Sequence, residues 1–425
     1  MERLIRGLIL TLAVSFYFFP FSFPFLPVGL NTKIFMAVFG ILAFVYNSIR
    51  HSGMYFSEPT LFSALLAAVF SVWCLFSITM SNSDDTIYAE YLVSYATWMA
   101  GAYGVYAALK IGYEEVNLEI LIRYLALAGV FQCVMAVLID NIPAVEYFVD
   151  RIMYQADDYY KEHHRMYGLG AALDPAGVRF SVILIMLAHL FSTNLNVRNE
   201  SLYQTSVLLG YAIITIIGAV ISRTTVIGAG MGLIYIIITL FRMRKGGFVT
   251  IGMIQAFFWF FIVLGAIVGV AIYMYRSSSV FQGYLRFGFE AFFNWVETGE
   301  FRTSSTDTLS EMWVWPDNLR TWIIGCGEFG VLKTDSDIGY CNFISYCGLV
   351  GMVIFSAFFL YCHLVQNRKF SNFVITSVLL VALTFVIWCK VTTDIFQIDA
   401  LLFCIAADSI VADRDPIVVV PREPV

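Results

Sequence analysis

Residues 275–340 read YRSSSVFQGYLRFGFEAFFNWVETGEFRTSSTDTLSEMWVWPDNLRTWIIGCGEFGVLKTDSDIGY, a composition unlike that of the rest of the chain. This stretch combines carboxylates, spaced arginines and aromatic side chains, whereas long apolar runs with short polar turns dominate the sequence on either side. Of the 425 residues, 60% are hydrophobic and only 13% are charged. An average soluble domain has about 25% charged residues. The contrast predicts an integral membrane protein with one large polar loop.

Apolar runs of membrane-spanning length recur along the chain. A bilayer core of about 30 Å requires about 20 apolar residues in a helix. Backbone polar groups in lipid must be satisfied internally, and the strands of a closed barrel would be shorter and alternating. The sequence therefore predicts an all-α, polytopic membrane protein with about twelve transmembrane helices. The predicted spans are 7–25, 31–48, 59–80, 87–109, 119–139, 175–194, 203–221, 224–241, 248–273, 342–364, 371–389 and 393–411.

Cations are distributed unevenly between the two sides of these spans. With cytoplasmic N- and C-termini, only Lys33, Arg223 and Lys390 fall in short outside turns. The cations on the inside would be Arg3, Arg6, Arg50, Lys110, Arg198, Arg242, Arg244, Lys245, Arg368, Lys369, Arg414 and Arg422. Cytoplasmic loops are enriched in Lys and Arg, so this orientation is favoured.

This orientation divides the chain into six parts. They are N-terminal transmembrane helices (1–140), a first outside loop (141–173), central helices with a hairpin at Arg223 (174–273), a large outside loop (274–341), C-terminal helices (342–412) and a cytoplasmic tail (413–425). The first apolar stretch has no signal-peptide cleavage site before the next span, so we interpret it as an uncleaved helix.

The net charge and the cysteine positions indicate which classes of partner and metal the chain is expected to bind. The net charge of −6, without a basic stripe, argues against nucleic acid. Most of the eight cysteines fall within or at the ends of spans, as apolar core residues do. Cys326 and Cys341 flank the end of the large loop and could pair in an oxidising compartment, unless Cys341 already belongs to the following helix. No cysteine pair has the spacing of a zinc site, and the histidines are scattered, so no metal is expected.

Three arginines occupy positions where the outside loops meet the membrane. Arg165 lies where the chain re-enters it, Arg179 lies about one turn into the next span, and Arg223 lies at the tip of a tight hairpin. A cation there is costly unless it faces a wet cavity or an anion. Guanidinium matches phosphate oxygens in a bidentate way. We interpret these residues as candidate anion ligands, with a plain interfacial anchor as the alternative for Arg223.

The first outside loop holds aromatic candidates. Tyr154, Tyr159 and Tyr160 are suited to stacking on sugar rings. The alternative is that 146–166 forms an amphipathic helix on the membrane surface. His164 is a candidate general base in the same loop.

The large loop adds further candidates. Arg286 lies in the aromatic stretch 280–297, which is expected to form a surface helix, and Arg320 precedes a glycine-rich turn. That turn would bring acidic side chains back over the membrane. The acidic candidates are Glu328, Asp335 and Asp337, and Tyr340 follows them as a candidate substrate contact. The alternative is a solvated charged rim.

The order of short motifs resembles the O-antigen polymerase and ligase superfamily, most closely the Wzy-type polysaccharide polymerases. These motifs are R-M-Y-G (165–168), D-P-A-G (174–177), S-R-T (222–224), I-I-G-C-G (323–327), T-D-S-D-I-G-Y (334–340) and G-L-V-G (348–351). The resemblance covers roughly 119–390. Two departures are Ala176, where the family often has Asn, and 337–340, where the ligase branch usually has a His-Asn pair.

The resemblance implies a metal-independent glycosyltransferase that uses no cofactor or nucleotide sugar. It would join undecaprenyl-diphosphate-linked oligosaccharide repeat units into O-antigen or capsular polysaccharide at the periplasmic face of a bacterial inner membrane. Arg165 and Arg223 match arginines of the family, with Arg286 or Arg320 as the third. A chain-length regulator and a flippase would be partners, in addition to the lipid bilayer.

Two alternatives stay open at this point. The first is an O-antigen ligase, which transfers finished polymer to another lipid acceptor. The second is a flippase or transporter of lipid-linked or anionic solutes, for which Asp394 and Asp399 would suggest a proton relay. Transporters usually have polar residues near the bilayer midplane, whereas here the unusual charge lies at the outer face. We therefore interpret Asp394 and Asp399 as the rim of a solvated cavity and favour the enzyme.

Overall fold

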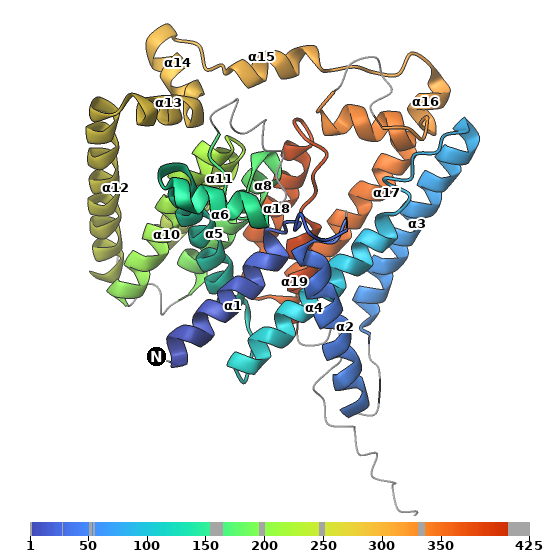
Figure 1. Ribbon diagram of the computed structural model, residues 1–425, viewed down its shortest axis with the longest axis horizontal. Coiled ribbons are helices and arrows are strands. Elements are labelled where there is room, and N and C mark those ends of the chain that lie inside the picture. The colour runs from blue at the N-terminus through green and yellow to red at the C-terminus, as the bar shows by residue number, and fades with distance from the viewer. Residues whose placement is uncertain are drawn as a thin grey trace, which may run out of the picture.

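The computed structural model describes residues 2–27, 29–50, 53, 56–153, 165–194, 200–245, 251–329 and 336–406. In these ranges the chain is almost entirely helical (Figure 1) and contains no β-strand beyond an isolated bridge between Ser22 and Asn31. The prediction of an all-α fold is confirmed.

The helices follow one another with short connections. They are α1 (Glu2–Phe18), α2 (Thr32–Arg50), α3 (Glu58–Ser81), α4 (Tyr91–Gly112), α5 (Leu118–Asn141), α6 (Pro143–Ile152), α8 (Leu173–Thr193), α10 (Ser201–Ile221), α11 (Thr225–Lys245), α12 (Ile251–Ser277), α13 (Ser279–Gly288), α14 (Glu290–Thr298), α15 (Ser304–Glu311), α16 (Leu319–Ile323), α17 (Gly339–Lys369), α18 (Val374–Ile387) and α19 (Phe396–Ile405).

Six helices in the described residues are long and apolar enough to cross a membrane: α2, α3, α5, α8, α10 from Leu202 onward, and α17. Shorter apolar helices are found in α11, α12, α18 and α19. Length and composition therefore indicate a membrane protein, and the larger number of twelve spans stays a prediction.

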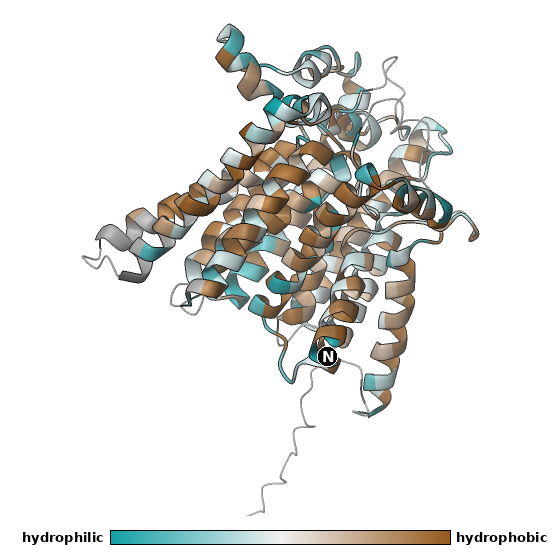
Figure 2. Ribbon diagram, turned by 60° about the vertical axis from the view of Figure 1, so that its left-hand side comes forward, coloured by the Kyte–Doolittle hydropathy of each residue, from teal (hydrophilic) through white to brown (hydrophobic). Residues whose placement is uncertain are grey.

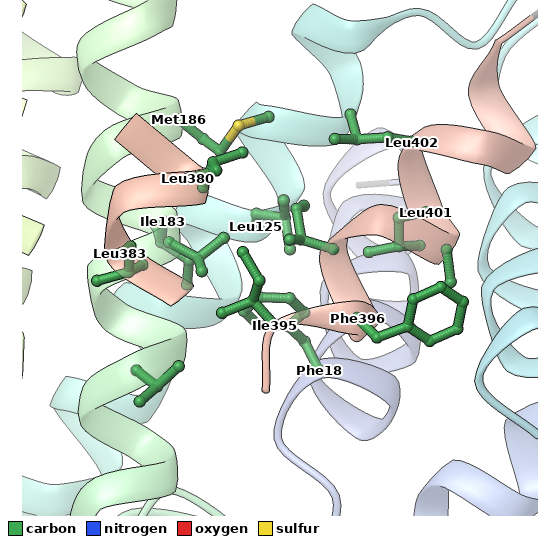
Figure 3. Packing of buried hydrophobic residues seen from close by; sticks show 14 of the residues in the cluster. Phe18, Leu125, Ile183, Met186, Leu380, Leu383, Ile395, Phe396, Leu401 and Leu402 are labelled. Carbon is green, nitrogen blue, oxygen red and sulfur yellow. The ribbon is translucent and has the colours of Figure 1, made fainter. Parts of the chain in front are cut away.

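Helix α8 lies at the centre of the bundle. Nearly all of its residues from Ala176 to Ser192 are buried, as expected for a helix that is apolar on every side. It packs against α5, α10, α11 and α18. In Figure 3, Ile183 and Met186 of α8 lie near Leu380 and Leu383 of α18, with Leu125 of α5 beside them. This packing holds the N-terminal end of α8 at a fixed place in the fold.

The short helices α13 to α16 cross one end of the bundle, the upper end in Figure 1. Figure 2 shows mostly hydrophobic colours along the bundle helices and more hydrophilic colours in this upper layer. The stretch 280–297 forms two helices instead of one, because Phe289 has a non-helical backbone (φ −120°, ψ 30°). In the first outside loop, α6 begins at Pro143, and Val149 is buried beside α5.

The end of the large loop is anchored to a break in α17 at Gly348, where φ is 68°. A Cβ at Gly348 would lie 2.2 Å from the carbonyl oxygen of Ile323, so only glycine fits. The Cys326 amide donates to the carbonyl of Ser345 at 2.7 Å. Ser345 lies about one helical turn after Cys341 in α17, so this hydrogen bond holds Cys326 beside Ser345 and not beside Cys341. Both thiols are free, so the disulfide considered from the sequence is absent.

Asp399 differs from the sequence-based interpretation. Its side chain is fully buried and accepts a hydrogen bond from Gln366 at 2.7 Å. Helix α19 packs against α4 and α17, which enclose this carboxylate. The expectation that Asp399 lines a solvated rim is therefore wrong.

Candidate functional site

A cavity of about 640 Å³ lies between the end of the bundle and the layer of short helices. Its walls come from the ends of α8, α10 and α17, from the connection between α18 and α19, and from α13 and α15 of the large loop. The charged residues that line it are Arg165, Asp174, Arg223, Asp337 and Lys390. Hydroxyl side chains line it at Ser222, Ser304, Ser305, Thr308, Ser336, Thr392 and Thr393. Two predicted arginines thus meet in one polar cavity.

Arg223 occupies the three-residue turn between α10 and α11. Its guanidinium forms an ion pair with Glu290 at 2.7 Å, its Nε donates to the carbonyl of Phe287 at 2.8 Å, and its Nη1 donates to Ser305 Oγ at 3.1 Å. Burial lowers the pKa of Arg223 from its ordinary value, and the nearby Glu290 charge opposes this shift. A guanidinium has five N–H donors, and Nη2 of Arg223 donates no hydrogen bond to a described residue. That side of the guanidinium can accept a ligand.

Phe287 of α13 joins the two arginines. The Cζ atom of Arg223 lies 4.1 Å from the centre of this ring, and that of Arg165 lies 5.3 Å from it. Both distances are within the range of a cation–π interaction. One aromatic ring therefore holds two like charges close together at the same cavity.

Asp174 and Lys390 form a second polar group in the cavity wall. Lys390 Nζ and Asp174 Oδ1 are 2.6 Å apart, and Oδ1 also accepts from Thr224 Oγ1 at 2.6 Å and from Ser222 Oγ at 3.2 Å. Lys390 Nζ further donates to Thr224 Oγ1 at 3.2 Å. An ammonium has three donors, so one N–H of Lys390 has no acceptor among the described residues and remains for a ligand.

The backbone at the start of α8 is adapted to this arrangement. A Cβ at Gly177 would lie 2.4 Å from Ser222 Oγ, so the helix approaches the 222–224 turn closely only because this residue is glycine. Leu173, next to Asp174, has a φ of 53°, a conformation that costs a non-glycine residue about 1–2 kcal/mol. Strained residues of this kind cluster at functional sites.

Other predicted arginines lie away from the cavity lining. Arg286 is exposed and pairs with Glu297, and its Nε donates to the Tyr275 hydroxyl at 3.1 Å. These partners raise the pKa of Arg286, first through the Tyr275 hydrogen bond. Arg320 is exposed and donates to the carbonyl of Met80. Arg179 is in α8, and its buried Nε has no hydrogen-bond partner among the described residues.

Of the remaining candidate residues, Asp337, Glu328 and Tyr340 lie in the described ranges and the others do not. Asp337 is exposed and lines the cavity. Glu328 is exposed and is not part of the lining, although the adjacent Phe329 is. Tyr340 donates its hydroxyl to the carbonyl of Phe385 at 2.9 Å. The candidates Tyr154, Tyr159, Tyr160, His164 and Asp335 lie outside the described residues.

Sequence reasoning missed Lys390 and Asp174 as parts of this site. In the sequence they are 216 residues apart, and Lys390 entered the argument only as an outside cation. The sequence signal that could have identified Asp174 was the D-P-A-G motif at 174–177, which marks the start of α8. Lys390 stands between α18 and α19 without a motif of its own.

The arrangement is suited to an anion. Three cations, two carboxylates and several hydroxyl groups line one volume. Within the described part of the chain, Arg223 and Lys390 have N–H donors that no side chain or carbonyl accepts. In the described part of the chain, no three His, Cys, Asp or Glu side chains gather as a metal site would require.

Comparisons of the chain with models of protein families, with curated proteins and with solved structures gave no match.

Proposed function

We propose that this chain is a membrane glycosyltransferase that polymerises lipid-diphosphate-linked oligosaccharide units. The observation that supports the proposal is the convergence of Arg165, Arg223 and Lys390, from separate parts of the chain, on one cavity of about 640 Å³. A diphosphate carries several anionic oxygens, which suits a cluster of cations in which Arg223 and Lys390 have N–H donors that no described residue accepts.

The proposed reaction needs stabilisation of a leaving group. The acceptor hydroxyl oxygen attacks the anomeric carbon of the donor sugar, the bond from that carbon to the diphosphate oxygen breaks, and its electron pair stays with the diphosphate. Cations fixed beside that oxygen stabilise the developing charge more in the transition state than in the ground state. Arg223 and Lys390 are held by Glu290 and Asp174, so their positions are set before substrate binds.

The acceptor hydroxyl must lose a proton during this step. Asp337 lines the cavity, and a carboxylate within reach of the hydroxyl can take the proton as general base. Asp174 is a poorer candidate, because one of its oxygens already accepts from Lys390, Thr224 and Ser222. We therefore assign the base to Asp337 among the described acids.

The membrane arrangement belongs to the same proposal. The chain would have about twelve spans and cytoplasmic termini in a bacterial inner membrane, with the short helices of the large loop on the periplasmic side. A polyprenyl diphosphate would then present its headgroup at the level of Arg223, in the turn between α10 and α11. A flippase would supply the substrate and a chain-length regulator would limit the product.

The proposal is tested by reconstituting the purified protein in liposomes with the lipid-diphosphate repeat unit of its own host. Wild type is expected to produce a ladder of polymer lengths. Arg223→Lys and Arg165→Lys, which keep the charge but lose the guanidinium fork, are expected to reduce the ladder strongly. Arg302→Lys is the matched control, because Arg302 is an exposed arginine of the large loop, is not part of the cavity lining and pairs with Asp307 at 2.8 Å.

Other outcomes would contradict the polymerase. A single transfer to a different lipid acceptor would show a ligase. Movement of the intact lipid to the opposite leaflet, without a covalent product, would show a transporter. A full ladder from both lysine variants would refute the role of the guanidinium groups.

A further inference from the structure

An aromatic ladder, made of Trp313, Trp315, Trp322 and Tyr340, lies in the large loop outside the cavity lining. Trp315 stacks on Trp322 with ring centres 5.4 Å apart, and Trp313 follows Trp315 at 5.5 Å. Tyr340 stacks on Trp313 at 6.5 Å, with an interplanar angle of 18°. The rings thus form one continuous row.

The backbone presents part of this row to solvent. Residues 313–316 have no regular secondary structure between α15 and α16, and Trp313 and Trp315 are both exposed while Val314 between them is less so. Trp313 is 41% exposed and Trp315 is 38% exposed, a large fraction for tryptophan side chains. The Trp322 indole is oriented by its Nε1 donating to the carbonyl of Pro316 at 2.8 Å.

Trp313, an inner ring of the ladder, adjoins the cavity wall. Met312, next to Trp313, lines the cavity together with Ser336, and Ser336 Oγ donates to the carbonyl of Met312 at 2.7 Å. Asn342, also in the lining, donates to the carbonyl of Ser336 at 2.6 Å. This chain of hydrogen bonds fixes Trp313 of the ladder relative to the cavity.

We propose that the aromatic ladder is a binding surface for a saccharide chain that extends out of the cavity. The choice of ligand rests on the proposed function. Flat aromatic faces suit the apolar C–H faces of pyranose rings. Asp317 and Asn318, which are exposed between Trp315 and Trp322 in the sequence, offer a carboxylate and an amide NH₂ group to sugar hydroxyls. Such a surface would hold the oligosaccharide without contacting the diphosphate.

The competing explanation is contact with the membrane. Leu319 and Ile323 of α16 are 74% and 43% exposed, and tryptophans are enriched at membrane interfaces. The two explanations differ in what the exposed rings touch, so they can be separated by direct measurement.

The first measurement is binding of lipid-free oligosaccharides, prepared from the surface polysaccharide of the source organism, to the purified full chain in nanodiscs. Trp313→Ala and Trp315→Ala are each expected to weaken binding about two- to twelvefold, which is the loss of one aromatic stacking contact of about 0.5–1.5 kcal/mol. Trp313→Phe and Trp315→Phe keep a ring and are expected to retain most of the affinity. Thermal melting of each variant verifies that it is folded.

Arg223→Ala separates this inference from the proposed function. It is expected to abolish polymer formation while leaving the oligosaccharide affinity unchanged, because Arg223 is not part of the ladder. If wild type binds oligosaccharide through the ladder but forms no polymer, the polymerase proposal fails and the saccharide surface stands. Equal affinities for wild type and the two alanine variants, or no binding by wild type, would overturn the ladder proposal.

The second measurement uses brominated lipids, which quench tryptophans in contact with the bilayer. The double variant Trp313→Phe/Trp315→Phe is expected to be quenched to the same fraction as wild type or a larger one, since the two removed rings would face water. A marked fall in the quenched fraction would show that these rings contact lipid, and would overturn the saccharide surface.

Discussion

Replacing Lys390 with alanine is expected to change both the stability of the fold and catalysis at this site. The substitution leaves the Asp174 carboxylate with hydrogen bonds from Thr224 and Ser222 but without its cation. It also removes a donor from the cavity. Lys390→Ala should therefore lower both the stability of the fold and the rate of polymer formation, for two different reasons.

The expected magnitudes follow from the surroundings of the pair. A charge-assisted hydrogen bond contributes about 1.5–3 kcal/mol. The two side chains are 23% and 28% exposed, so water replaces part of the lost interaction. We expect the free energy of unfolding to fall by about 1–2 kcal/mol. Loss of one fixed donor to a developing negative charge lowers the rate by about a hundredfold or more.

The double variant Asp174→Asn/Lys390→Met distinguishes the two effects. It removes both charges and keeps an amide oxygen that can accept from Thr224 and Ser222, so the melting temperature should return close to that of wild type. Polymer formation, measured as initial rate in liposomes, should stay about a hundredfold low. Recovery of the rate in the double variant would refute the reasoning, because Lys390 would then serve only to neutralise Asp174.

Three further substitutions test other parts of the account. Gly177→Ala places a Cβ 2.4 Å from Ser222 Oγ, and thermal melting should show a destabilisation of about 1–3 kcal/mol; an unchanged melting temperature would contradict this close packing. Phe287→Leu removes the ring that both cavity arginines contact, and the KM for the lipid-linked unit should rise while melting changes little; an unchanged KM would count against the ring. Arg286→Ala breaks an exposed pair with Glu297. The free energy of unfolding should therefore stay within about 0.5 kcal/mol of wild type, and the rate of polymer formation should be unchanged. A large loss of activity would reinstate Arg286 in the site.

The fold class followed from the sequence because apolar runs of membrane-spanning length are a strong local signal. The break in α17 was not expected, since it depends on Gly348 meeting the carbonyl of Ile323 from a distant loop. The division of 280–297 at Phe289 was also missed, because hydrophobic periodicity continues across the non-helical residue. Local patterns thus predicted helices better than their interruptions.

The candidate site was predicted only in part, because local sequence signals identified some of its residues and tertiary contacts brought in the others. Arg165 and Arg223 stood out because cations at membrane boundaries are unusual, and both line the cavity. Lys390 stood in an equivalent position but lacked a motif, and its partner Asp174 comes from another part of the chain. Arg286 looked equivalent to Arg223 in sequence, yet it pairs with Glu297, which lies 11 residues later in α14. Tertiary packing, which one sequence does not encode locally, decides which arginine faces the cavity.

The central claim is that the cavity cleaves a sugar–diphosphate bond, and the most direct measurement is the stoichiometry of the reaction. Wild-type protein in liposomes should release one polyprenyl diphosphate for each glycosidic bond formed, and Arg223→Ala should release almost none. Consumption of the lipid-linked unit without release of polyprenyl diphosphate, or equal release by wild type and Arg223→Ala, would contradict the account.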